Sequence, residues 1–162
     1  MHNSLKITTF VIDDKGIVKK ILFIPAIPGR TKQMIMKTHQ EVLLVLQSRM
    51  DDYKFRLQKY SQLAFDNYMK FFELHACDAF KLAYKIESLS VFFKEDGSEL
   101  DESELREYLQ AGIGFFTKEL LERPLQAATS NAMTNQAHVL KLEAAQELLR
   151  LYKQMMSKFD IK

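Results

Sequence analysis

"LLVLQSRMDDYKFRLQKYSQLAFDNYMKFFELHACDAFKLAYKIESL", residues 43–89, decides the fold because it carries one apolar stripe through a stretch that favours helix. Neither Gly nor Pro occurs between Arg30 and Asp96. The stripe recurs in steps of three and four residues, the spacing of one helix face. We therefore predict a long helical region over residues 30–96. The members of the stripe are Leu43, Leu46, Met50, Tyr53, Leu57, Tyr60, Ala64, Tyr68, Phe71, His75, Ala79, Leu82, Ile86 and Leu89.

A single straight helix of about 60 residues would be about 90 Å long. A coiled coil could use such a helix, but its apolar seam is thin. A second set of apolar side chains favours more burial than that seam provides: Leu44, Phe65, Met69, Phe72, Leu74 and Phe80. The predicted fold class is mainly α, a helical bundle with an N-terminal β-hairpin and one long helix. That helix either runs straight or is bent or broken near residues 48–62.

Two more helices are predicted downstream. Asp101 and Glu104 have the spacing of a capping box, which starts a helix over residues 101–123, and Pro124 ends it. Gly112 and Gly114 interrupt this helix and indicate either a close helix crossing or a kink.

A C-terminal helix is predicted over residues 134–160, where apolar residues again recur at heptad-like spacing. The preceding segment, Ser130 to Met133, can be a natural connector or a junction between two proteins. We interpret it as natural.

The N-terminal segment "LKITTFVIDDKGIVKKILFIP", residues 5–25, predicts a β-hairpin within residues 1–29. Two β-rich runs flank Asp13–Gly16, and Asp and Gly supply the chemistry of a turn. A lone two-stranded hairpin is marginal in water. It is therefore expected to pack on the helices or to pair with a second copy.

Size and composition predict a single domain over residues 1–162. The chain has 162 residues, of which 47% are hydrophobic, enough for a real core. It has one cysteine, so an intrachain disulfide is excluded and a reducing compartment is favoured. No signal peptide and no membrane-spanning apolar stretch is recognisable, so we expect a soluble, cytoplasmic protein.

The most reactive-looking stretch contains His75, Cys77 and Asp78. On an intact helix His75 and Cys77 would point about 200° apart, too far for a dyad or a shared metal. We therefore interpret them as a histidine of the core or of a helix interface, a small buried cysteine and a surface aspartate.

Motif searches indicate no metal, no cofactor and no catalytic residue. Glu-x-x-His pairs, a calcium loop, a Walker loop and a dinucleotide-binding glycine pattern are all missing from the sequence. An enzyme whose site is assembled from distant residues stays open, and its first candidates are His39, Glu41, His75 and His138.

Charge is distributed unevenly along the chain. Residues 1–60 hold eleven Lys and Arg against five acids, whereas residues 61–110 hold five against eleven. The basic end suggests a nucleic-acid-binding regulator as the alternative function. Its candidate polyanion-binding residues are Lys19, Lys20, Arg30, Lys32 and Lys37.

The leading functional hypothesis is a non-enzymatic protein-interaction module, such as an adaptor, a chaperone-like factor or a small regulator. Abundant apolar helix surface without a coherent catalytic set favours it. Self-association, giving a homo-oligomer, is expected through the long stripe or the hairpin edge. The candidate interface residues are Leu57, Tyr60, Tyr68 and Phe71.

Overall fold

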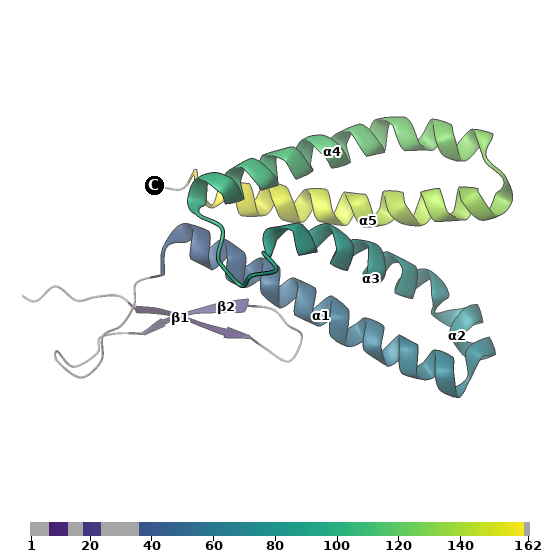
Figure 1. Ribbon diagram of the computed structural model, residues 1–162, viewed down its shortest axis with the longest axis horizontal. Helices are drawn as coiled ribbons and strands as arrows, with labels where there is room; N and C mark the ends of the chain where they lie inside the picture. The colour runs from purple at the N-terminus through teal and green to yellow at the C-terminus, as the bar shows by residue number, and fades with distance from the viewer. Residues whose placement is uncertain (1–6, 13–17, 24–35, 161–162) are drawn as a thin grey trace, which may run out of the picture.

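Two helical hairpins, joined by a loop, make up the C-terminal four-fifths of the chain (Figure 1). The computed structural model describes residues 7–12, 18–23 and 36–160, and it describes side chains for residues 36–160. The first hairpin pairs α1 with α3 through the short helix α2, and the second pairs α4 with α5. The helices are α1 (Thr38–Asp66), α2 (Tyr68–Leu74), α3 (Ala76–Leu89), the 3-10 helix η1 (Ser90–Phe92), α4 (Glu102–Thr129) and α5 (Ala132–Ser157).

The predicted mainly α fold is confirmed, and the described part of the long helical region predicted over residues 30–96 contains three α-helices and a 3-10 helix. Helix α1 runs without interruption through residues 48–62, where a bend or break was predicted. The chain reverses later, at Asn67 and His75, which both leave the helical region of backbone space. The Asn67 side chain accepts a hydrogen bond from the backbone N–H of Lys70 at 3.1 Å and so starts α2. One helix thus becomes a hairpin without any Gly or Pro.

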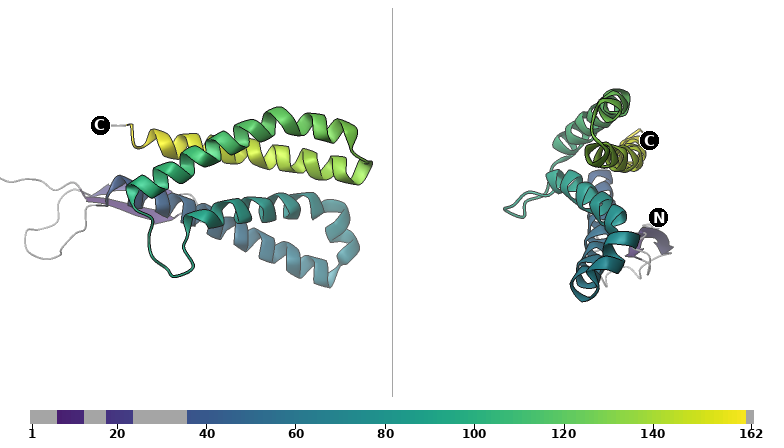
Figure 2. Two further views of the ribbon diagram at one scale, coloured as in Figure 1. Left: turned by 45° about the horizontal axis from the view of Figure 1, so that its top comes forward. Right: turned by 90° about the vertical axis from the view of Figure 1, so that its right-hand side faces the viewer.

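The two hairpins meet along a seam between α3 and α5, which run in the same direction (Figures 1 and 2). Lys81 Nζ pairs with Glu143 at 3.0 Å, and Lys85 pairs with Glu147 one turn further along both helices. The hydrogen bond and the carboxylate of Glu143 raise the pKa of Lys81, with partial burial working against them. These contacts fix the register of the seam.

The core lies along this seam and takes side chains from α1, α3, η1, α4 and α5. Tyr152 of α5 is its aromatic centre. The ring stands edge-on to Phe92 at 5.4 Å and to Phe116 at 5.3 Å, and its hydroxyl donates to the carbonyl of Ser88 at 3.4 Å. Burial raises the pKa of Tyr152 far above its usual value.

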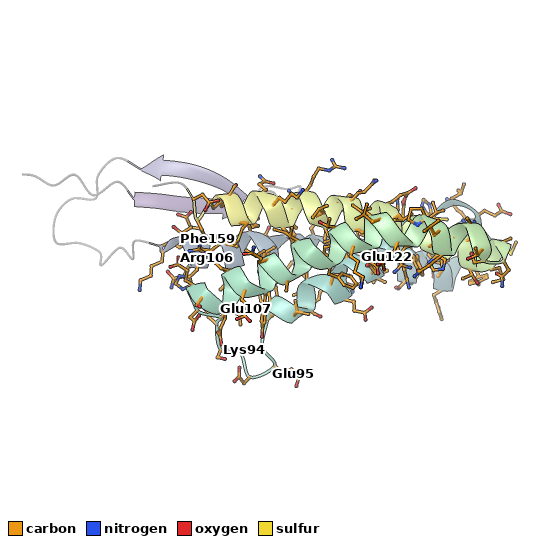
Figure 3. All side chains as sticks on the ribbon, turned by 90° about the horizontal axis from the view of Figure 1, so that it is seen from above. Lys94, Glu95, Arg106, Glu107, Glu122 and Phe159 are labelled. Carbon is orange, nitrogen blue, oxygen red and sulfur yellow. The ribbon has the colours of Figure 1, made fainter. Side chains whose placement is uncertain are left out.

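Gly112 lets α4 approach Tyr152 closely. A Cβ atom built at Gly112 would overlap the Tyr152 ring, whereas one at Gly114 would meet nothing within 4 Å. Of the two roles predicted for these glycines, Gly112 therefore serves the close crossing. At the same end of the molecule, the guanidinium of Arg106 lies 5.5 Å from the ring centre of Phe159 and closes the end of α5 onto α4 (Figure 3).

The predicted ends of the last two helices are partly wrong. The capping box is confirmed, since the Asp101 carboxylate accepts from the Glu104 N–H at 2.8 Å and Glu104 reciprocates at 3.2 Å. However, α4 continues through Pro124 to Thr129 instead of ending at residue 123. A proline removes one helical hydrogen bond and bends the helix, and Figure 1 shows α4 curving over its last turns.

Helix α5 covers residues 132–157 rather than 134–160, because Asn131 caps it two residues earlier than predicted. The Asn131 side chain accepts from the N–H of Thr134 at 3.0 Å. Ser130 and Asn131 thus form the whole turn between α4 and α5.

In the N-terminal part, strand β1 (Ile7–Ile12) pairs antiparallel with strand β2 (Val18–Phe23), with Ile7 opposite Phe23. The turn expected at residues 13–16 and the side chains of both strands lie outside the described residues. The hairpin as a folded unit over residues 1–29, and the single domain over residues 1–162, therefore stay predictions. None of the helices within residues 36–160 is long and apolar enough to cross a membrane.

Candidate functional site

The stretch around His75 is a helix junction and not a reactive centre. His75 ends α2 and precedes α3, so the helix is interrupted at that position. Its ring is half-buried and stacks on Tyr60 of α1, with ring centres 5.1 Å apart. His75 is thus the interface histidine that was predicted, and it holds the end of α1 against the start of α3.

Cys77 is exposed, so the prediction of a buried cysteine is wrong. The residue begins α3 on the side facing α5, where Gln136 donates to its sulfur at 3.3 Å. Asp78 is exposed as predicted and pairs with Lys81 at 3.7 Å. Within residues 36–160, no group of three or more His, Cys, Asp or Glu side chains is arranged to hold a metal ion.

His138 is the one candidate histidine with a notable polar environment. Nη1 of Arg123 lies 2.7 Å from Nδ1 of His138, and Glu119 holds the same guanidinium from the other side. Since a guanidinium can only donate, Nδ1 must accept and the neutral ring carries its proton on Nε2. This chain of contacts joins α4 to α5 and holds the last part of α4 in place beside Pro124.

The predicted interface residues divide into two pairs. Leu57 and Tyr60 are partly buried and pack against the core. Phe71 is partly buried, and Tyr68 is 61% exposed. The Tyr68 ring lies 6.3 Å from the Phe71 ring and 6.2 Å from the Phe72 ring. The first pair therefore stabilises the fold, whereas the second lies on the surface around α2.

Several large apolar side chains are exposed where α1 ends and α2 turns the chain back. We call these residues the apolar tip. Phe65 is 87% exposed, and the other four are between 59% and 63% exposed. Most members had been assigned to a second buried face, so that expectation is wrong here. The apolar tip consists of Phe65, Tyr68, Met69, Phe72 and Leu74.

The turn between α4 and α5 lies at the same end of the molecule as the apolar tip (Figures 1 and 2). The helices that flank this turn carry three exposed apolar side chains, Leu121 and Leu125 of α4 and Met133 of α5. Single exposed apolar residues are ordinary, but large exposed patches mark interaction surfaces. This end of the molecule is therefore the candidate functional surface.

Of the candidate polyanion-binding residues, the structure describes only Lys37 with its side chain. Lys37 is exposed at the start of α1. The side chains of Lys19 and Lys20, and all of Arg30 and Lys32, lie outside the described residues. Nucleic-acid binding by the basic N-terminal region stays a prediction.

Comparisons with family models, with curated proteins and with solved structures find no match to this chain. Its function is therefore inferred from its own residues.

Proposed function

We propose that the chain is a protein-interaction module that self-associates through the apolar tip. The observation that carries the proposal is the exposure of five large apolar side chains between residues 65 and 74. Leaving so much apolar surface in water is costly, at roughly 25 cal/mol per Å². Association would remove that cost, because it buries the apolar side chains of the tip.

The charges around the apolar tip favour a second copy as the partner. Asp66, Lys70 and Glu73 are exposed among the apolar side chains, so both signs of charge occur within one small patch. A two-fold interface brings the same patch of both copies together. Lys70 of one copy would then face an acid of the other, with the apolar residues between them.

The test is the absolute mass in solution by light scattering over a range of protein concentrations. We expect the wild-type chain to dimerise, and the double variant Met69→Ser/Phe72→Ser to stay monomeric. Both side chains are exposed, so the helical circular dichroism should barely change, and the melting temperature should match that of the wild type at concentrations where the wild type is monomeric. Phe115→Ser, an exposed aromatic on α4 outside the tip, is the matched control and should dimerise like the wild type.

A wild-type chain that is monomeric across the range would overturn self-association. A dimer that survives the double variant would show that another surface, such as the β1–β2 edge, makes the contact.

A further inference from the structure

A groove on the side of the bundle combines an excess of positive charge with space for a small ligand. It has a volume of about 400 Å³ and lies between α1 and α5, with α3 beneath them. We call it the α1–α5 groove. Its lining residues come from matching faces of the two helices and one residue of α3: Arg49, Asp52, Tyr53 and Arg56; Glu147, Arg150, Leu151 and Gln154; and Lys85.

The floor of the groove contains a buried lysine whose charge is paired. Lys85 is 8% exposed, and its ammonium group pairs with Glu147 and lies 5.1 Å from the ring centre of Tyr53. Tyr53 is itself buried, which is the main reason that its pKa is raised. Because each of these groups already has a partner, the floor is fixed and does not need a ligand to hold it.

The walls of the groove carry unbalanced charge. Arg56 Nη2 pairs with Asp52 at 3.1 Å, so this arginine is neutralised within α1. Among the residues that the structure describes, no carboxylate lies within 4.0 Å of the guanidinium of Arg49 or of Arg150. The groove therefore holds four cations against two carboxylates, and its surplus comes from one arginine on each wall.

Both carboxylates already have a cationic partner, since Asp52 pairs with Arg56 and Glu147 with Lys85. This favours binding over catalysis. The guanidinium groups of Arg49 and Arg150 suit an anion with more than one charge, since each can donate two parallel hydrogen bonds to neighbouring phosphate oxygens. The volume exceeds what one orthophosphate ion fills and is typical of small-molecule sites.

We propose that the α1–α5 groove binds the phosphate groups of a small molecule, inorganic or esterified, with Arg49 and Arg150 as ligands from opposite walls. This site lies away from the apolar tip, so the proposal does not depend on self-association.

The experiment is titration calorimetry of the full chain with inorganic tripolyphosphate and, separately, with a nucleoside triphosphate. We expect binding that weakens as salt is added, and an affinity about tenfold or more lower in Arg49→Gln/Arg150→Gln. The control Lys54→Gln/Lys118→Gln removes the same charge from exposed positions outside the groove and should bind within about twofold of the wild type.

A gain-of-function variant guards against misfolding of the arginine variant. Asp52→Asn removes one negative charge and frees Arg56, so it should tighten binding several-fold. Failure of both probes to bind at low salt would overturn the proposal, as would equal weakening in the arginine variant and in the control. Equal affinity for the two probes would indicate recognition of the phosphate chain alone, and tighter binding of the nucleotide would indicate an ester.

Discussion

The aromatic core around Tyr152 and the apolar tip around α2 are built from the same kinds of residue and have opposite environments. In the core, Phe92, Phe116 and Tyr152 are at most 3% exposed, and Phe92 and Phe116 each contact the Tyr152 ring edge-on. In the tip, Tyr68 and Phe72 stack on each other but remain more than half exposed. The core has α3, α4 and α5 around it, whereas the side chains of the tip remain exposed although the turn between α4 and α5 lies at the same end of the molecule.

The difference shows that helical spacing predicts which aromatic residues share one helix face, but not whether that face is buried. What decides burial is whether another helix packs against that face. Stability should therefore depend on the core, and association on the tip, and each of the following changes tests that division.

The largest difference in stability is expected from truncating one tyrosine in the core and one in the tip. Tyr152→Ala leaves a cavity between Phe92 and Phe116 and should lower the free energy of unfolding by about 3–5 kcal/mol. Measured at concentrations where the chain is monomeric, Tyr68→Ala should change it by about 0.5 kcal/mol or less, because the ring is mostly in water. Urea denaturation measures both. Comparable losses in the two variants would mean that the tip is part of the core in solution.

A smaller effect is expected from adding one methyl group to a glycine. In Gly112→Ala the new Cβ overlaps the ring of Tyr152, and the forced repacking should cost about 1–3 kcal/mol. Gly114→Ala is the control two residues away, where the Cβ meets nothing. It should raise the melting temperature slightly, because alanine favours helix over glycine by up to about 1 kcal/mol. A lower melting temperature for Gly112→Ala and a higher one for Gly114→Ala would support the close α4–α5 crossing.

The smallest effect is expected at the helix caps. Asp101→Ala removes the capping box of α4 beside the core and should cost about 1 kcal/mol of global stability. Asn67→Ala removes the cap of α2, so faster amide exchange within residues 68–74 is expected with little change in the unfolding midpoint. Equal global losses in the two variants would argue that α2 unfolds together with the core.

Much of the helical fold could be predicted, because spacing and capping are local signals. The stripe from Leu43 to Tyr53 is buried as expected, and the Asp101 cap starts α4. The reversal at Asn67 could not be placed in the same way. Its only local signal is one asparagine, and the contact that stabilises the turn, His75 against Tyr60, joins residues 15 positions apart.

The predicted end of α4 before Pro124 was wrong for a related reason. A proline normally ends a helix, but contacts of Arg123 with Glu119 and His138 hold α4 to α5 at that level, and tertiary contact overrides local preference. The candidate surfaces were predictable only in part. Tyr68 and Phe71 were identified from sequence, but the charges of the α1–α5 groove come from two helices about 100 residues apart in the chain, and only the folded structure brings them together.

The exposed thiol of Cys77 makes the seam between the hairpins directly observable. It is the only cysteine of the chain, it lies at the start of α3, and it touches Gln136 of the opposite hairpin. A fluorophore or nitroxide attached there needs no introduced cysteine. It would sit a few residues from the apolar tip, so a single label can report both the separation of the hairpins and the arrival of a second copy.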